Sequence, residues 1–441
     1  MRYGDRRAWV WSVMLATALV GAWPVVAAQL EAIPPGAAYA GLQPLKAPAP
    51  GPLLLQTGDR LAVIGDSITE QQMYSRLIED YLTVCVPQLA VTVRQFGWSG
   101  ETAEGFLRRM DSDCLRLKPT VATLCYGMND YRYKPFDEAN GQWYRERYTA
   151  VVKGLQAAGA RVVVGSNGCV GKVASWVKSA SGTLEQHNDC LCRMRNIALE
   201  VAAERGVRFA DIFWPQFKAG VEARARYGAE FNIAGGDGVH PGWAGHLVMA
   251  YAYLRALGLN GNIGTLTLDY PTSEANGSPG HAVERCARGE MTVYSTRYPF
   301  VLTGNPTKDD STRAGASLVP FSRELNRLML VVKRAPAGNY RVTWGEQTVT
   351  FTAAQLAAGI NLADAFPDNP FGPAFAKVDD AVRAKQAFER TQIKERFHSA
   401  EFKANPDAVV AQTEATHAQL AAALAAAVVP VRHVVRVERV R

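Results

Sequence analysis

Apolar and polar residues follow two different patterns along the chain, and the change between them falls near Gly258. Before that position, short apolar runs rich in β-branched residues alternate with stretches whose apolar residues recur at helical spacing. This arrangement is typical of βαβ units and a parallel sheet. Strands are expected over 61–64, 91–96, 120–125, 161–165 and 207–212, and the longest helices over 142–158, 184–205 and 242–257. The pattern predicts an α/β fold, a three-layer sandwich around a five-stranded parallel sheet.

The pattern changes after Gly258 to apolar runs with a period of two, and no long helices are expected between these runs. Strands are expected over 265–270, 290–296, 328–334, 340–345 and 347–352. Residues 259–371 are therefore predicted to form a smaller, mainly antiparallel β-rich unit. Residues 372–441 are predicted to form a helical C-terminal extension, whose apolar run LAAALAAAVV is too short to span a membrane.

The N-terminal segment differs from both units. Residues 1–28 combine three arginines, an apolar stretch and small residues before Gln29, which is typical of a cleavable signal peptide. A membrane anchor is the alternative, but Gly21 and Pro24 interrupt the run and no second span follows. The protein is thus expected to be periplasmic or secreted, without a stable membrane span. Residues 29–57 are rich in proline and form either a spacer or a segment lying along the domain 58–258.

Composition and charge exclude several classes of protein. Apolar residues make up 48% and charged residues 20% of the 441 residues, as in ordinary globular proteins. The net charge of +7 is distributed without blocks of like charge, so nucleic acid is not an expected partner. Seven cysteines would permit up to three disulfides in an oxidising compartment. His187, Cys190 and Cys192 lack a second ligand pair, so no metal site is expected.

Four motifs follow predicted strands or precede the last helix of the first unit. They are GDSITE (65–70), FGWSGET (96–102), YGMNDYR (126–132) and GGDGVHPGWAGH (235–246). The carboxyl ends of parallel strands meet at one edge of a sheet, where ligands bind. Each motif alone has a structural explanation, since GDSITE could simply cap a helix and DGVHP could be a turn. Their order and common position favour a single catalytic site.

In these motifs the sequence resembles the SGNH, or GDSL-type, hydrolases over residues 58–258. The resemblance implies a flavodoxin-like SGNH fold, with Ser67 as nucleophile and with Asp237 and His240 completing the triad. It also implies an oxyanion hole formed by Ser67, Gly100 and Asn129, and it implies no cofactor. Ile68 stands where the family name has leucine, which is a conservative aliphatic change.

The resemblance implies a secreted serine ester hydrolase with an acyl-enzyme intermediate. Likeness to polysaccharide acetylesterases favours deacetylation of carbohydrates, so the expected partner is a small-molecule or polysaccharide ester. A lipase, phospholipase or thioesterase is the enzymatic alternative, and a non-catalytic glycan- or surface-binding protein is the other. An ordinary α/β-hydrolase is disfavoured because no GxSxG motif occurs. The sequence does not indicate the oligomeric state.

Two further groups of residues lie near the motifs in the sequence. The aromatic residues could stack on sugars or simply pack; they are Trp98, Tyr126, Tyr131, Tyr133 and Trp143. His246, on the helix that follows His240, is expected to be structural rather than catalytic.

Overall fold

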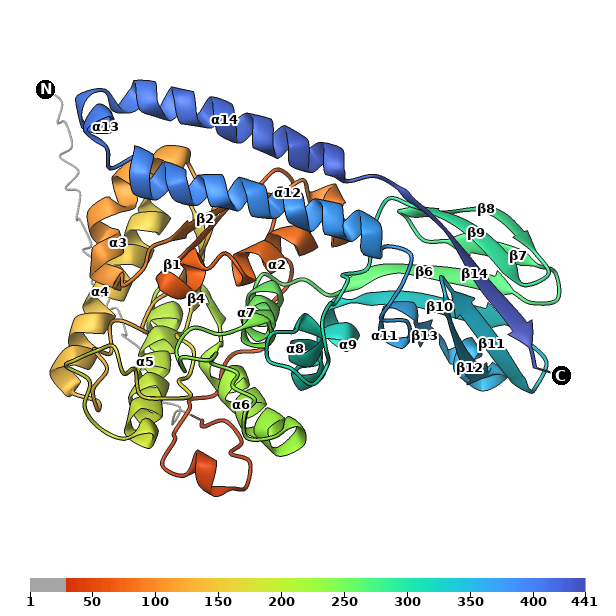
Figure 1. Ribbon diagram of the computed structural model, residues 1–441, viewed down its shortest axis with the longest axis horizontal. Coiled ribbons are helices and arrows are strands. Elements are labelled where there is room, and N and C mark those ends of the chain that lie inside the picture. The colour runs from red at the N-terminus through yellow and green to blue at the C-terminus, as the bar shows by residue number, and fades with distance from the viewer. Residues whose placement is uncertain (1–28, 441) are drawn as a thin grey trace, which may run out of the picture.

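The structure is a computed structural model that describes residues 29–440 (Figure 1). The expected signal peptide, residues 1–28, lies outside the described residues. No helix within residues 29–440 is both long enough and apolar enough to cross a membrane.

The five strands predicted in the first unit form one parallel sheet in the order β2-β1-β3-β4-β5. They are β1 (Arg60–Gly65), β2 (Thr92–Gly97), β3 (Val121–Cys125), β4 (Arg161–Gly165) and β5 (Arg208–Ala210). In this order the chain first winds from β1 to β2 and then crosses to β3 on the other side of β1. The crevice beyond the carboxyl ends of β1 and β3 is the switch point, where ligands bind in such sheets.

Helices cover both faces of this sheet, which confirms the predicted three layers. One face carries α3 (Ala103–Arg109), α4 (Glu138–Ala157) and α5 (Leu184–Glu204), which pack side by side. The other carries α2 (Tyr74–Asp80) and α7 (Trp243–Ala256). The structure adds α6 (Phe213–Tyr227), which packs between α5 and α7 and was not among the predicted long helices.

The β-rich unit contains two sheets that bury one face each, as the period-two pattern predicts. The first has the order β13-β10-β6-β7 and consists of β6 (Asn262–Asp269), β7 (Glu274–Gly277), β10 (Arg327–Lys333) and β13 (Ile360–Asn361). The second has the order β12-β11-β14-β9-β8 and consists of β8 (His281–Ala287), β9 (Glu290–Ser295), β11 (Asn339–Trp344), β12 (Gln347–Thr352) and β14 (Val431–Arg439). Within these two sheets, β6 and β10 pair in parallel and the other neighbouring strands pair antiparallel. Short helices connect these strands: α8 (Thr312–Leu318), α9 (Phe321–Leu325), α10 (Ala353–Ala358) and α11 (Leu362–Ala365).

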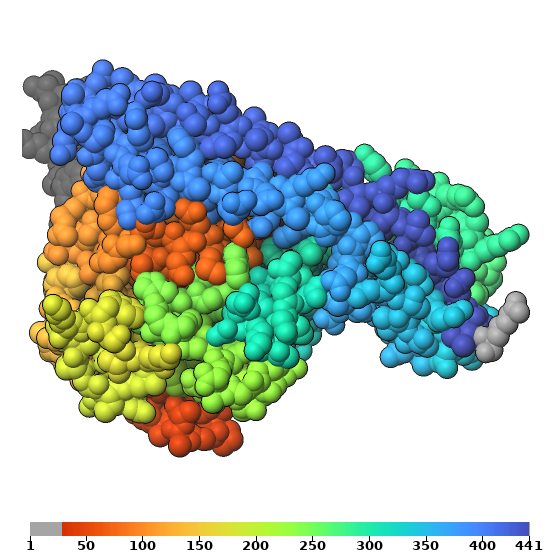
Figure 2. Space-filling model, viewed as in Figure 1, coloured from red at the N-terminus to blue at the C-terminus, as the bar shows by residue number. Residues whose placement is uncertain are grey.

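The C-terminal extension is helical only as far as Ala427. It comprises α12 (Gly372–Thr391), a π-helical turn (Gln392–Arg396), α13 (Ala400–Ala404) and α14 (Pro406–Ala427). The extension predicted as helical over 372–441 ends in a strand that was not predicted, β14 (Val431–Arg439), which pairs with β9 and β11 in the second sheet. The chain therefore leaves the β-rich unit, packs α12 against α2 and β2, and returns to complete that unit. Figure 2 shows this helical segment, in blue, lying across the N-terminal part of the first unit, in red and orange.

Residues 29–57 lie along the first unit instead of acting as a free spacer. The Tyr39 ring packs edge-on against Trp214 and Phe217, with ring centroids 5.8 Å apart in both pairs. The backbone amide of Leu45 donates to the side chain of Asn196 at 3.0 Å. Of the two alternatives left open by the sequence, the structure favours the segment that follows the domain surface.

All seven cysteines are free thiols in the structure, and six of them are buried. The disulfides that the sequence permits are therefore not formed. Buried free cysteines behave as small apolar side chains, and burial raises the pKa of the Cys125 thiol well above its ordinary value.

Candidate active site

Ser67 lies directly beyond β1 as the first residue of the short helix α1 (Ser67–Glu70). The preceding Asp66 is the N-cap, and its carboxyl accepts a hydrogen bond from the Ile68 amide at 3.0 Å. The turn therefore caps a helix and also presents Ser67 at the switch point of the sheet. Gly97, at the end of β2, allows α1 to lie close to that strand, because a Cβ there would lie 2.2 Å from the Glu70 amide nitrogen.

Ser67, His240 and Asp237 form a continuous hydrogen-bonded chain. Ser67 Oγ lies 2.8 Å from His240 Nε2, and His240 Nδ1 lies 2.7 Å from Asp237 Oδ2. The other carboxylate oxygen of Asp237 accepts the backbone amides of Val239 at 2.8 Å and His240 at 2.9 Å. Burial raises the pKa of Asp237, but these hydrogen bonds outweigh it and the pKa falls below its ordinary value. An ionised Asp237 holds the His240 proton on Nδ1 and leaves Nε2 as a base.

Gly100 and Asn129 offer hydrogen-bond donors on the loops beside Ser67. Gly100 has a φ of +73°, a backbone conformation that favours glycine. An added Cβ would meet nothing within 4 Å, so lack of space is not the reason for glycine at this position. Asn129 donates one Nδ2 hydrogen to the Glu101 carbonyl at 3.0 Å. A carboxamide nitrogen carries two hydrogens, so the second is available to a substrate oxygen.

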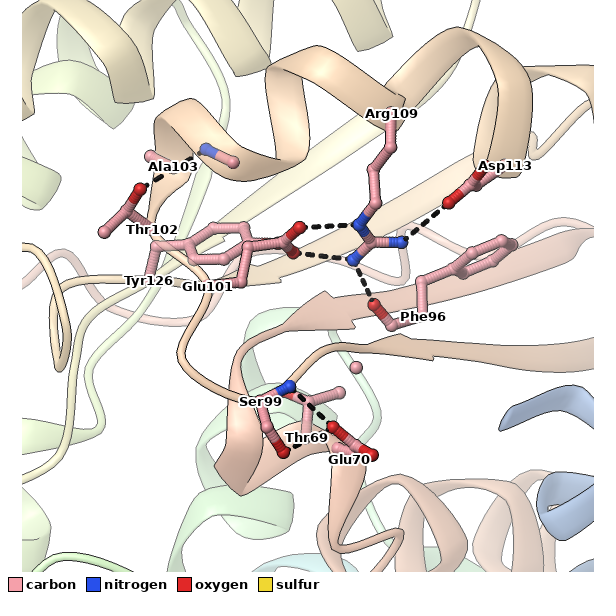
Figure 3. Close-up of polar contacts among 12 residues, drawn as sticks. Thr69, Glu70, Phe96, Ser99, Glu101, Thr102, Ala103, Arg109, Asp113 and Tyr126 are labelled. Carbon is pink, nitrogen blue, oxygen red and sulfur yellow. Dashed lines mark hydrogen bonds and ion pairs between the residues drawn. The ribbon is translucent and has the colours of Figure 1, made fainter. Parts of the chain in front are cut away.

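Buried carboxyl groups that sequence reasoning missed fix these loops. Asp130 accepts the amides of Ala103 and Gly127, both at 2.9 Å, and so links the loops after β2 and β3. Glu101 accepts both arms of the Arg109 guanidinium at 2.6 Å and the Tyr126 hydroxyl at 2.6 Å (Figure 3). Asp130 directly follows Asn129 in the sequence, but nothing local indicates that its partners lie in another loop.

Burial raises the pKa of Asp66 to about 8, and the carboxyl groups of Asp130 and Glu101 raise it further against the hydrogen bond from Ile68. Asp66 is therefore mainly protonated at neutral pH. A neutral carboxyl group beside Ser67 adds no negative charge where a substrate oxygen would become negative.

The aromatic residues named from the sequence mostly pack. Tyr126, Tyr131 and Tyr133 are buried, and Arg132 and Arg147 lie over the Trp143 ring. Arg109 of α3 and Lys394 of the C-terminal extension lie over the Trp98 ring, whose centroid is 4.9 Å from that of the His398 ring. His246 is buried, accepts the Tyr74 amide at 3.3 Å and contacts Gln71, as expected of a structural residue.

Trp176, which the sequence analysis did not single out, lies beside the candidate catalytic histidine. Its ring is stacked on His240, with centroids 6.0 Å apart, and 47% of the residue is exposed. It comes from the loop between β4 and α5, which has no periodic pattern that would indicate its position.

Comparisons with known proteins identify the class of the first unit. Residues 63–248 match the model of the GDSL-like lipase/acylhydrolase family. The chain is 24% identical to an acetylxylan esterase of Geobacillus stearothermophilus over 225 residues, which are 46% of this chain and 95% of that protein. Residues 63–248, which match the family model, include all four motifs. The first unit is a hydrolase domain of the SGNH, or GDSL, family.

The fold as a whole is also found in a solved structure. A gut microbial diltiazem-metabolizing enzyme superimposes with a TM-score of 0.67 at 21% identity, covering 88% of this chain and 100% of that one. Coverage of this extent includes most of the chain beyond the hydrolase domain. The parallel-sheet domain and the additional β-rich and helical regions therefore occur together in another protein.

Proposed function

We propose that this protein is a serine ester hydrolase in which Ser67, His240 and Asp237 form the catalytic triad. The observation that carries the proposal is the hydrogen-bonded chain from Ser67 Oγ through the His240 ring to Asp237. Ser67 Oγ attacks the ester carbonyl while His240 Nε2 takes its proton, and the proton then passes to the departing alcohol. Water, deprotonated by the same nitrogen, attacks the acyl-enzyme and releases the acid and Ser67.

The negative oxygen of each tetrahedral intermediate is proposed to accept hydrogen bonds from the backbone amides of Ser67 and Gly100 and from Asn129 Nδ2. Donors fixed in advance at such a position stabilise the transition state more than the ground state. The hydrogen bond from Asn129 to the Glu101 carbonyl supports this assignment, because it fixes the orientation of the amide.

The proposed substrates are acetylated carbohydrates, and the apolar leader sequence suggests that the enzyme meets them after export. The acetylxylan esterase to which the domain is similar supports an acetyl ester. The exposed ring of Trp176 beside His240 supports a sugar ring, because flat aromatic faces pack well against sugars.

Acyl-chain length separates this proposal from a lipase. The loops after Ser67, Gly100 and Asn129 are mixed polar and aromatic, so we expect kcat/KM on aryl esters to be highest for acetyl and to fall by butyryl. A long-chain pocket would instead gain roughly 0.8 kcal/mol for each buried methylene. The measurement is kcat/KM from acetyl to octanoyl below micelle formation, together with acetate release from acetylated xylan. A maximum at octanoyl would support a lipase and contradict the acetylesterase proposal.

Replacing Trp176 by alanine should weaken binding of a sugar substrate. Loss of an aromatic contact of roughly 0.5–1.5 kcal/mol corresponds to a KM increase of about 2- to 13-fold on acetylated xylo-oligosaccharides. The small aliphatic substrate ethyl acetate should show little change in KM. Trp176→Phe, which keeps an aromatic face, should restore most of the binding. Equal losses on both substrates would instead assign Trp176 to the support of His240.

A further inference from the structure

Glu70, the last residue of the helix α1 that begins with Ser67, connects the C-terminal extension to the loop after β2 that carries Gly100. Its side chain is only 7% exposed and accepts Arg390 Nε at 2.7 Å and Lys394 Nζ at 2.8 Å. The carboxylate oxygen Oε2 also accepts both the backbone amide and the hydroxyl of Ser99 at 2.5 Å (Figure 3). A single carboxylate therefore joins Arg390 and Lys394, both more than 300 positions from Glu70 in the sequence, to Ser99, the residue before Gly100.

Gly100 is held from both sides. On one side Ser99 is fixed by Glu70, and on the other Glu101 is fixed by the fork of Arg109 and the hydroxyl of Tyr126. Glycine in a left-handed conformation has no side chain of its own to fix it, so its amide direction depends on these neighbours. The carboxylates of Glu70 and Glu101 are thus placed to determine where the Gly100 amide points.

The extension is attached to the sheet firmly enough to act as a support. The strand β2 lies at the edge of the parallel sheet, so its outer backbone groups need partners. Lys385 Nζ donates to the Val93 carbonyl at 2.7 Å, and the Glu389 carboxylate accepts the Gln95 amide at 3.0 Å. Side chains of α12 therefore replace a neighbouring strand, and the same helix brings Arg390 to Glu70.

Charge also links the extension to the site. Burial raises the pKa of Glu70, but hydrogen bonds from Lys394, Ser99 and Arg390 outweigh burial and lower the pKa to about 2. Glu70 is therefore ionised at any ordinary assay pH. Without the two cations, a nearly buried negative charge would remain three residues from the nucleophile, where further negative charge must develop.

We propose that Glu70 is a positioning residue, which Arg390 and Lys394 of the extension hold in place so that Ser99 presents the Gly100 amide to the reacting oxygen. This inference rests on the proposed esterase function. It makes the C-terminal extension part of the catalytic machinery, although all four motifs lie before Gly258.

The test is the double variant Arg390→Ala/Lys394→Ala in the full chain, with Arg396→Ala as a matched control. Arg396 lies in the same π-helical turn as Lys394, but it pairs with Glu401 and Gln412 within the extension. We expect the double variant to lose roughly tenfold in kcat on an aryl acetate, with KM within about twofold, since a displaced donor acts mainly on the transition state. Affinity for phenylboronic acid, which forms a tetrahedral adduct with a serine, should fall by a similar factor. Arg396→Ala should keep both values.

The side chains of Arg390 and Lys394 are 44% and 20% exposed, so their removal should leave the fold intact, which a thermal unfolding curve checks. Glu70→Gln, which keeps an acceptor for Ser99, should retain more activity than Glu70→Ala. Wild-type kcat and boronate affinity in the folded double variant would overturn the inference, as would a loss confined to KM or equal in Arg396→Ala. An inactive wild-type protein, or activity that survives Ser67→Ala, would instead overturn the proposed esterase function.

Discussion

Replacing Ser67 by alanine is expected to lower ester hydrolysis by about 10³-fold or more and to leave the fold intact. The hydroxyl is the group that forms the covalent bond to the acyl carbon, and His240 has no other nucleophile within hydrogen-bond distance in the described chain. Ser67 occupies the first position of α1, where alanine is tolerated, and Asp66 supplies the cap. The measurement is kcat/KM on an aryl acetate, together with an unfolding curve.

A fluorophosphonate probe distinguishes loss of the nucleophile from loss of substrate binding. It should label the wild-type protein and fail to label Ser67→Ala. Ser317→Ala, which removes an α8 hydroxyl that bonds to Tyr227 outside the four motifs, should be labelled normally. Hydrolysis by a folded Ser67→Ala variant at near the wild-type rate would contradict the assignment of Ser67 to the catalytic triad.

Much of the hydrolase fold was predictable because its signals are local. The five strands are short apolar runs, and each lies within a few residues of its predicted position. Parallel strands bring their carboxyl ends to one edge, so residues following β1 and β3 could be expected to meet before any contact was known. The hydrogen-bonded chain from Ser67 to His240 joins residues 173 positions apart, and both residues belong to the four motifs.

The strand β14 was missed although its pattern has the right period. His433, Val435 and Val437 are buried and alternate with exposed residues, as in a half-buried strand. The segment follows a 22-residue helix, and its partners β9 and β11 belong to a unit that the pattern had treated as finished at residue 371. Sequence patterns indicate that a strand exists, whereas the choice of partner depends on long-range packing.

The role of Glu70 could not be predicted from its neighbours for a different reason. A glutamate at the end of a short helix is most simply solvent-exposed, and its burial and its ion pairs depend on the approach of α12 and of the π-helical turn that follows it. Trp176 is similar, since an irregular loop gives no period from which its place beside His240 follows. Residues that fix or flank the site from other parts of the chain require the tertiary structure, whereas residues in the strand-end motifs do not.

Asp237→Asn should reduce kcat/KM at neutral pH by roughly 10³- to 10⁴-fold, an effect nearly as large as loss of the nucleophile. The geometry explains why an almost isosteric change is so harmful. Asp237 Oδ1 accepts two backbone amides, so asparagine must place its carbonyl oxygen there or leave both donors unpaired. Its NH₂ group then faces His240 Nδ1, where the carboxylate accepted a hydrogen bond at 2.7 Å.

A donor in that position forces Nδ1 to become the acceptor, and the single proton of the neutral imidazole moves to Nε2. That nitrogen can then no longer take the proton of Ser67, although every heavy atom remains close to its original place. The fluorophosphonate should accordingly react far more slowly with Asp237→Asn, while the unfolding curve stays near that of the wild type. Asp380→Asn is the matched control, because it makes the same chemical change in an exposed pair with Arg383 and should keep full activity. If Asp237→Asn kept wild-type turnover in a folded protein, Asp237 would not be the residue that sets the His240 tautomer.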